Sequence, residues 1–388
     1  MSFARFNHVS QRPARVRTLF TLTLLAAAIG TAHAAPEVAR SVKVDDRVYE
    51  IAFNPSTQAI YAAVTGERVP EGESAEGKVT AGIVVLEADT LKQVNKIATG
   101  RVTPFGLAIN NQTQKIYAGD TPQGLIAVYD VDSGKEVAII ESKGDESNHV
   151  RTIVVDEKTN KIYVTTVGGM SRDETPGPKS AIWVIDGATD KLESVILDPV
   201  ASATGLALDS DQQRLYVSDM SKNEIAEIDI KTQKVLRKFA SVAVEENARP
   251  AAAGPVSDTI NLEIDTKNGM LYAINQKSGT VSLIDIKSGK VLKTVKTGSG
   301  ALSARVNPKT GDLYVANRGD GTVSVIDGKT HFVTAHLSTG IHPQTVAIDP
   351  KTGQVYVSNK SKGKGRGAGP EVPTPVEVTG NTVTLITP

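Results

Sequence analysis

The feature that most constrains this chain is a phrase repeated seven times: an aliphatic run, an Asn or Asp, a short polar turn, and an aliphatic–Tyr–Ala/Val triplet. The tyrosines are Tyr61, Tyr117, Tyr163, Tyr216, Tyr272, Tyr314 and Tyr356. Seven residues before them stand Asn54, Asn110, Asp156, Asp209, Asp265, Asn307 and Asp349. Self-similarity at a period of about 40–55 residues, built from strand-like segments, is typical of a β-propeller. Seven copies predict seven blades around a central channel.

The sixth copy shows the strands of one blade. Four strand-like segments are separated by turns that contain Gly, Lys and Thr: Ala304–Asn307, Asp312–Asn317, Thr322–Asp327 and Val333–Ser338. Tyr, Val and Ile favour a pleated, half-buried surface, and short strands joined by tight turns form an antiparallel meander. We therefore predict an all-β fold, a seven-bladed β-propeller with four-stranded antiparallel blades.

The last copy lacks a fourth strand of its own. Thr382–Thr387 reads as its third strand, and the chain then ends. Val38–Val44 near the other terminus resembles Val291–Lys296, which reads as the fourth strand of blade five. Closing the ring would protect strand edges that otherwise invite pairing. We expect the N-terminal strand to complete the C-terminal blade and close the ring.

The inner strands show a shared alternation of large and small residues. Eight residues before each Tyr stand Phe53, Ile109, Val155, Leu208, Ile264, Val306 and Ile348. One position earlier stand Ala52, Ala108, Val154, Ala207, Glu263, Arg305 and Ala347. Side chains alternate between the two faces of a strand, so neighbouring blades can interdigitate large against small. The exceptions, Glu263 and Arg305, predict a partly buried ion pair, with a functional role as the alternative.

Residues 1–34 have the pattern of a secretory signal peptide. Arg5, Arg12, Arg15 and Arg17 form a basic region, Leu19–Ile29 is apolar, and Ala32–Ala34 is an A-x-A cleavage signal. The apolar core is too short to span a bilayer comfortably. We expect a cleaved leader followed by one propeller domain at 35–388, exported to the periplasm and without a transmembrane segment.

Charge and cysteine content exclude several functions. Without the leader the chain holds 39 basic and 43 acidic residues, a formal charge of −4, which argues against a broad electrostatic footprint for nucleic acid. There is no Cys, which rules out disulfides, thiolate metal sites and Cys nucleophiles. A local basic groove remains compatible with this composition.

Length variation falls on one class of connections. The loops that lead into the inner strands and those between second and third strands vary, and in a propeller these two classes share one face. The variable loops are Gly66–Thr80, Glu141–Asn148, Gly168–Ser180, Ser241–Asp258 and Lys360–Asn381. Variable loops on a rigid scaffold commonly carry binding, so we expect a functional face there. Basic Lys360–Arg366 and acidic Glu67–Glu76 would neutralise each other across blades seven and one.

The repeat alignment places a set of polar and aromatic residues at the mouth of the central channel. Concave mouths where all blades converge are the default ligand sites of such folds. The ligand-binding candidates are Arg47, Tyr49, Glu50, Arg101, Phe105, His149, Arg151, Asp258, Asn261 and His342.

An enzymatic alternative uses the same mouth. Glu50, Asn261 and Asp258 offer oxygen ligands for a hard divalent cation, with His149 or His342 as acid or base. Lactonases built on propellers use such an arrangement. The sequence contains no GxSxG, HExxH, P-loop or EF-hand motif.

The repeats resemble the YVTN family of propeller repeats, and more closely the exported bacterial YncE-type proteins. The phrases that carry the resemblance are PFGLAINNQTQKIYAG (104–119), SAIWVIDG (180–187), TGLALDSDQQRLYV (204–217) and HPQTVAID (342–349). The resemblance covers essentially the whole chain after the leader. It implies a periplasmic, non-enzymatic seven-bladed propeller of a type reported to bind single-stranded DNA and associated with iron-responsive expression.

The resemblance supplies no residue motif for DNA binding. Tyr49 and Phe105 are suited to stack on bases, while Arg47, Arg101 and Arg151 are suited to meet phosphates. We therefore expect a monomeric binding or scaffold propeller without a cofactor, whose partner is single-stranded DNA or an envelope protein. The alternatives are a metal-dependent, lactonase-like hydrolase at the channel and a structural envelope protein that partners another envelope protein.

Overall fold

A computed structural model describes residues 1–2, 35–44, 47–66, 79–169, 177–243, 258–363 and 377–388. The chain divides into two compact units, Met1–Ala34 and Ala35–Pro388. The signal-peptide prediction falls on the first unit and lies almost wholly outside the described residues. The second unit is described below.

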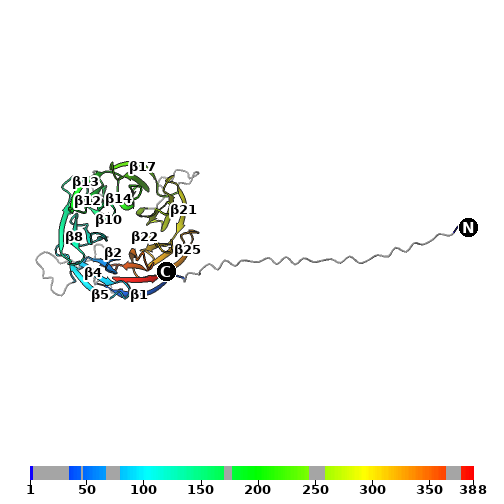
Figure 1. Ribbon diagram of the computed structural model, residues 1–388, viewed down its shortest axis with the longest axis horizontal. Helices are drawn as coiled ribbons and strands as arrows, with labels where there is room; N and C mark the ends of the chain where they lie inside the picture. Colours follow the sequence, from blue (N-terminus) through cyan, green and yellow to red (C-terminus); the bar gives the residue numbers. More distant parts are fainter. Residues whose placement is uncertain (3–34, 45–46, 67–78, 170–176, 244–257, 364–376) are drawn as a thin grey trace. The chain divides into compact units, whose positions relative to one another are not determined.

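The described residues of the second unit form 28 strands in seven four-stranded antiparallel sheets, arranged as blades around a ring (Figure 1). Blades one to three comprise β2 (Val48–Asn54), β3 (Ala59–Val64), β4 (Gly82–Glu87), β5 (Gln93–Ala98); β6 (Gly106–Asn110), β7 (Lys115–Asp120), β8 (Leu125–Asp130), β9 (Glu136–Glu141); β10 (Val150–Asp156), β11 (Lys161–Thr166), β12 (Ala181–Asp186) and β13 (Lys191–Leu197). Blades four to six comprise β14 (Ala203–Asp209), β15 (Arg214–Asp219), β16 (Glu224–Asp229), β17 (Lys234–Ala240); β18 (Thr259–Asp265), β19 (Met270–Asn275), β20 (Thr280–Asp285), β21 (Val291–Lys296); β22 (Ala301–Val306), β23 (Leu313–Asn317), β24 (Thr322–Ile326) and β25 (Val333–Ser338). Blade seven comprises β26 (Pro343–Ile348), β27 (Val355–Asn359), β28 (Thr382–Thr387) and β1 (Glu37–Lys43). The predicted fold class is confirmed, and among the described residues there is no helix, so none that could span a membrane.

Blade seven closes the ring in the way the sequence predicted. Strand β1 pairs antiparallel with β28, and the register sets Ser41 opposite Thr384. The Thr384 hydroxyl donates to the Ser41 hydroxyl at 2.9 Å. The first strand of the propeller is therefore the outer edge of its last blade.

The described part of the propeller contains seven hydrophobic core clusters, and each cluster joins two neighbouring blades. The seven repeat tyrosines are all buried in these interfaces. Tyr356 of blade seven, for example, stacks on Phe53 of blade one with 5.9 Å between ring centroids. Each blade thus buries its apolar residues against its neighbours. The predicted ion pair also forms, with Arg305 Nη1 3.3 Å from Glu263 Oε2.

The two variable classes of loop meet on one face, as predicted. In six blades the backbone N–H four residues after the repeat Tyr donates to the carbonyl fourteen residues before it; the donors are Thr65, Val167, Met220, Gln276, Arg318 and Lys360. Each bond joins the residue that begins the loop between the second and third strands to the residue that precedes the inner strand. The two kinds of loop therefore start side by side. Residues 67–78, 170–176, 244–257 and 364–376, and with them the predicted neutralisation between Lys360–Arg366 and Glu67–Glu76, lie largely outside the described residues.

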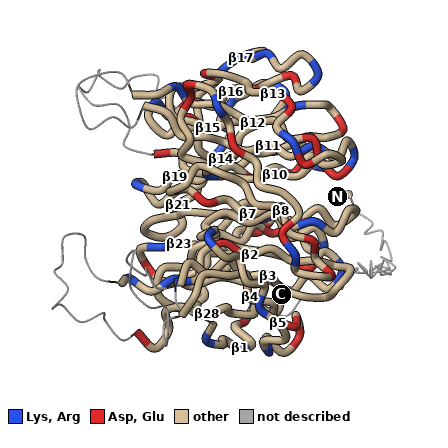
Figure 2. The backbone as a smooth tube through the Cα atoms, turned by 90° about the vertical axis from the view of Figure 1, so that its left-hand side faces the viewer, with Lys and Arg blue, Asp and Glu red and all other residues tan. Residues whose placement is uncertain are grey.

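Seen from the side, Lys and Arg are interspersed with Asp and Glu over the described outer strands and turns (Figure 2). The visible surface carries both signs of charge. A charged binding site must therefore come from a local cluster rather than from the charge of a whole face.

Candidate functional site

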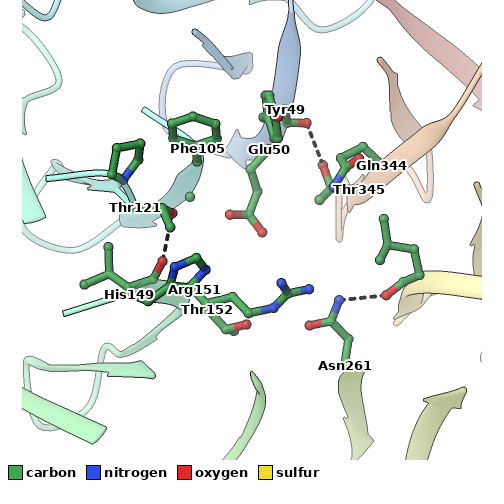
Figure 3. Close-up of a pocket in the computed structure, with 14 residues that line it drawn as sticks. Tyr49, Glu50, Phe105, Thr121, His149, Arg151, Thr152, Asn261, Gln344 and Thr345 are labelled. Carbon is green, nitrogen blue, oxygen red and sulfur yellow. Dashed lines mark hydrogen bonds between the residues drawn. The ribbon is translucent and has the colours of Figure 1, made fainter. Parts of the chain in front are cut away.

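The mouth of the central channel contains a cavity of about 280 Å³. Six of the ten sequence candidates line it: Tyr49, Glu50, Phe105, His149, Arg151 and Asn261. They come from the first residues of β2, β10 and β18 and from the segments just before β6 and β10. Their side chains converge from several blades (Figure 3).

Irregular strand pairing helps to direct these side chains. In six of the seven blades the register of the inner strand shifts near its first residues, for example between Val48 and Ile51 and between Val150 and Ile153. Such bulges disturb the alternation of faces and re-aim side chains. Glu50 and Arg151 lie within these shifts, and both point into the channel (Figure 3).

Glu50 is a carboxylate held at the wall of the cavity. Its Oε2 accepts the N–H of Leu107 from the next blade at 2.8 Å. Burial raises the pKa of Glu50, against the lowering effects of this hydrogen bond and of the Arg305 and Arg151 charges. Gly106 makes room for it, because a Cβ there would lie 3.3 Å from Glu50 Oε2 and 3.0 Å from the Arg151 carbonyl oxygen.

Arg151 extends its guanidinium across the cavity toward Glu50 and Asn261 (Figure 3). Its Nε is buried and has no hydrogen-bond partner among the described residues. Burial lowers the pKa of Arg151, while the Glu50 and Asp258 charges oppose that shift. The same guanidinium, after burial, lowers the pKa of His149, which favours the neutral imidazole.

Asn261 is fixed by a hydrogen bond from Nδ2 to the Leu302 carbonyl at 2.7 Å. This bond directs its amide oxygen into the cavity (Figure 3). On the other side, Thr345 Oγ1 accepts the N–H of Ile51 at 3.1 Å, and the Ser358 hydroxyl donates to the Tyr49 carbonyl at 2.6 Å. Blade seven thereby holds the backbone that presents Tyr49 and Glu50.

Tyr49 and Phe105 form an aromatic wall, with ring centroids 4.8 Å apart and an interplanar angle of 73°. Lys360 Nζ lies 3.8 Å from the centroid of the Tyr49 ring and donates to its hydroxyl. Burial, and then the Arg318 and Arg47 charges, lower the pKa of Lys360 to about 8. Burial also raises the pKa of Tyr49. Lys360, expected in a basic loop, therefore lies on this aromatic wall.

Arg318 and Lys360 are mouth residues that were not among the sequence candidates. Arg318 Nη1 donates to Gln344 Oε1 at 2.8 Å, and burial lowers the pKa of Arg318. Both residues stand four positions after a repeat Tyr, where the other blades carry Thr65, Thr121, Val167, Met220 and Gln276. The same repeat alignment could have found them, because this position begins the loops on the mouth face.

Four sequence candidates do not line the cavity. Arg47 is exposed, and its carbonyl accepts the N–H of Thr65. Arg101 is exposed as well, and its carbonyl accepts from Gln123. Asp258 forms an ion pair with Lys277 at 3.7 Å. Burial, followed by the Arg318 charge, lowers the pKa of His342, whose Nδ1 has no hydrogen-bond partner among the described residues.

The predicted divalent-cation site does not fit this arrangement. Asp258 pairs with Lys277 instead of lining the cavity, and the Glu50 carboxylate and Asn261 amide oxygen face the Arg151 cation (Figure 3). Within the described part of the chain no group of three or more His, Cys, Asp or Glu is placed to hold a metal ion. A bare divalent cation between Glu50 and Asn261 would face the guanidinium with no anion between the two, and that repulsion opposes its binding.

Comparisons with known proteins agree with the fold. Residues 139–318 match the family model described as SMP-30/Gluconolactonase/LRE-like region. The chain is 28% identical over 280 residues to the uncharacterized protein YncE of Escherichia coli K12, covering 70% of this chain and 71% of that protein. It is 29% identical over 314 residues to YncE of Salmonella typhi, covering 71% of this chain and 83% of that protein.

Proposed function

This chain is a homologue of the YncE proteins built as a seven-bladed β-propeller, and from that premise we propose that it is a non-enzymatic binding module of the periplasm. Its ligand contacts the face where the variable loops meet, and an anionic part of the ligand lies at the channel mouth. Single-stranded DNA, the ligand expected from the YncE-type resemblance, is the first to test.

The observation that carries this proposal is the cluster of cations at the mouth. Arg47, Arg318 and Lys360 lie close enough together for the first two to lower the pKa of the third. Arg151 lies just inside, and the Arg318 charge also lowers its pKa. Cations held this close repel one another, and an anion relieves that repulsion. Phosphates of a flexible single strand suit such a groove, and the aromatic wall beside it is a surface for a base.

Oligonucleotide binding as a function of salt tests the proposal. Neutralising a phosphate releases counterions, so affinity falls with salt, with a log–log slope of about −0.7 per contact for single strands. We expect Arg318→Gln and Lys360→Gln each to weaken binding of a labelled oligonucleotide and to reduce the slope by about that amount. Fluorescence anisotropy between low and physiological salt measures both quantities.

Lys135→Gln is the matched control, because Lys135 is exposed and lies in the turn between β8 and β9, away from the mouth-face loops. It should leave affinity and slope unchanged. Binding that does not depend on salt, or that is insensitive to both mouth variants, would contradict an anion-binding mouth.

The match to a family named for gluconolactonase favours hydrolysis as a second candidate function. It covers residues 139–318, which include His149, Arg151 and Asn261 but not Glu50. The residues at the mouth do not fit a resident divalent cation, so hydrolysis ranks below binding. Elemental analysis of the purified protein separates the two, since a stoichiometric, tightly held divalent metal would favour the hydrolase.

A further inference from the structure

We propose that the cavity at the channel mouth binds a small zwitterion, an α-amino acid in size and chemistry. Its carboxylate lies on Arg151, and its amino group lies between Glu50 and Asn261. The inference rests on the proposed binding function, because it concerns the inner part of the same mouth. It adds a ligand class that the cluster of Arg47, Arg318 and Lys360 alone does not specify.

The first step is the unsatisfied guanidinium. Arg151 has five N–H donors, and its Nε is buried with no hydrogen-bond partner among the described residues. Burying a charged group without partners is costly, and a planar fork of donors matches a carboxylate in a bidentate geometry. The guanidinium faces the open cavity (Figure 3), so a bound carboxylate would satisfy it.

The second step is the carboxylate that faces Arg151. Glu50 uses Oε2 for the Leu107 N–H, and the carboxylate points into the cavity (Figure 3). Glu50 and Arg151 line the same cavity, so a ligand in that cavity can contact both charges. A negative wall repels a dianion such as phosphate and attracts an ammonium group. One positive and one negative wall together select a ligand with both charges.

The third step is size and polarity. A cavity of about 280 Å³ lies just below the range of about 300–1,000 Å³ typical of small-molecule pockets, which suits a compact ligand. The Asn261 oxygen, held by the bond to the Leu302 carbonyl, is a further acceptor for an ammonium group. Tyr49 and Phe105 offer an apolar wall for a side chain. A free amino acid of moderate size meets each of these conditions.

Three probes with one carbon skeleton test the assignment by isothermal titration calorimetry on the intact protein. Leucine carries both charges, 4-methylpentanoate lacks the amino group, and 3-methylbutylamine lacks the carboxylate. We expect leucine to bind at least about tenfold more tightly than either analogue, since a tenfold ratio corresponds to one modest polar contact. Inorganic phosphate should bind more weakly than leucine.

Two variants test which residue contacts each charged end of the ligand. Arg151→Gln should weaken leucine at least about tenfold, and Glu50→Gln should abolish the preference for leucine over 4-methylpentanoate. Lys135→Gln is the control, and thermal unfolding of each variant confirms that it is folded.

The inference is overturned if no probe binds, if leucine and 4-methylpentanoate bind equally to the unmodified protein, if phosphate binds best, or if folded Arg151→Gln binds leucine unchanged. Oligonucleotide binding without leucine binding would overturn this inference alone, and leucine binding without oligonucleotide binding would instead remove the DNA proposal.

Discussion

Glu50 shows how a single residue at the mouth affects the whole fold. Its pKa lies above the ordinary value of 4.5, and the main cause is burial of the carboxylate. Between 4.5 and the raised pKa the folded protein therefore binds more protons than the unfolded chain. Stability falls as pH rises through that window, because the charged form is the one that burial penalises. Above the window the full cost of the buried charge is present.

We therefore predict that Glu50→Gln is more stable than the unmodified protein at pH 7. Gln keeps an oxygen that can accept the Leu107 N–H, so the hydrogen bond need not be lost. The gain should shrink as pH falls and disappear below about 4.5, where Glu50 is protonated in both states. Urea unfolding at a series of pH values measures it. Glu136→Gln, at an exposed site, is the control, and a gain that is the same at every pH would contradict the buried-charge explanation.

Individual residues also show how much of the candidate site could be predicted from the sequence. Alignment on the repeat tyrosines found Tyr49, Glu50, Phe105 and Arg151, because strand spacing fixes how far each residue lies along the channel. It failed where the backbone leaves the strand. Positions fourteen residues before the Tyr line the cavity only at His149; at Arg47, Asp258 and His342 the backbone has φ of 60°, 55° and 48°.

A φ in the left-handed region is uncommon outside Gly, and it breaks the alternation on which the expectation for these three residues depended. No spacing rule in a single sequence reports it. The hydrogen bond from the residue four positions after the Tyr does not by itself set this conformation, because the His149 carbonyl accepts the same bond from Val167 without a positive φ. Local backbone geometry, more than residue type, decides which candidates line the cavity.

At the scale of the element, the Asn or Asp of each repeat fixes the turn after the inner strand. Its side-chain oxygen accepts a backbone N–H two or three residues later in all seven blades, at Ser56, Gln112, Lys158, Gln212, Asn268, Lys309 and Lys351. Such side-chain turns compete with regular structure and end the strand. This is why the ends of the inner strands were predictable from the repeat, whereas their starts were not: the inner strand of blade six begins at Ala301 instead of Ala304.

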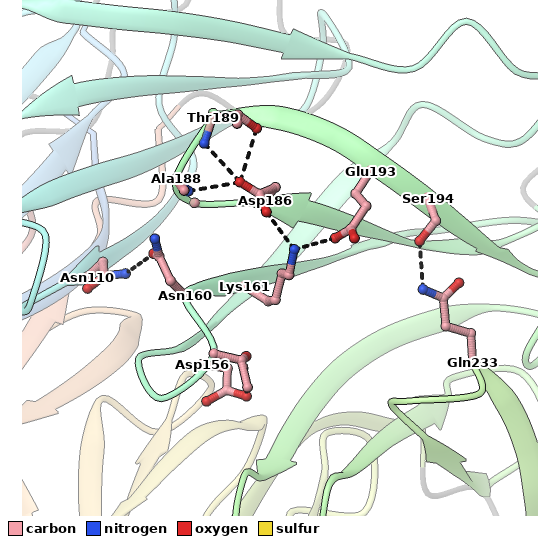
Figure 4. A network of polar contacts seen from close by, with 12 residues as sticks. Asn110, Asp156, Asn160, Lys161, Asp186, Ala188, Thr189, Glu193, Ser194 and Gln233 are labelled. Carbon is pink, nitrogen blue, oxygen red and sulfur yellow. Dashed lines mark hydrogen bonds and ion pairs between the residues drawn. The ribbon is translucent and has the colours of Figure 1, made fainter.

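Several of these residues also connect one blade to the next. Asn110 Nδ2 donates to Asn160 Oδ1 of the following blade at 2.9 Å (Figure 4). The turn after the third strand of blade three is built similarly. The Asp186 carboxylate accepts hydrogen bonds from the Thr189 N–H and from Lys161 Nζ (Figure 4). The Lys161 hydrogen bond is the main reason that the pKa of Asp186 is lowered to about 2. The repeat predicted the turns but not the bonds between blades, since those depend on where the neighbouring blade lies.

Asn307 tests the double role of this position. Its Oδ1 accepts the Lys309 N–H at 3.0 Å, and its Nδ2 donates to the Gly353 carbonyl of blade seven at 2.9 Å.

We predict that Asn307→Ala destabilises the fold by about 2–3 kcal/mol, of which about 1 comes from the turn and the rest from the buried carbonyl left unpaired. Asp265→Ala is the matched comparison, because the hydrogen bonds from Asn268 to Asp265 stay within its own turn. It should cost about 1 kcal/mol in urea unfolding. Equal losses would mean that the bond between blades adds nothing.

At the scale of the whole molecule, stability depends on closing the ring. Every apolar cluster lies between two blades, so a blade that loses a neighbour exposes half of an interface. The chain has no Cys, and the β1–β28 pairing joins the two ends of the ring without a covalent bond. All other paired strands within a blade are consecutive in the chain. We infer that opening of the ring begins at this pairing.

A disulfide between β1 and β28 tests that inference. Ser41 and Thr384 are opposite each other in the register, 343 residues apart in sequence. Ser324 and His336 are opposite each other in blade six, only 12 residues apart. In the chain-entropy model a cross-link that closes a longer loop stabilises more, by about 3 kcal/mol for a short loop and about 5 kcal/mol for a very long one.

We predict that Ser41→Cys with Thr384→Cys raises the unfolding temperature, oxidised relative to reduced, by more than Ser324→Cys with His336→Cys. The oxidised ring-closing variant should also unfold more slowly in concentrated urea, because the step that opens the ring is blocked. If the two pairs give the same gain, or if only the blade-six pair slows unfolding, the ring does not open between β1 and β28.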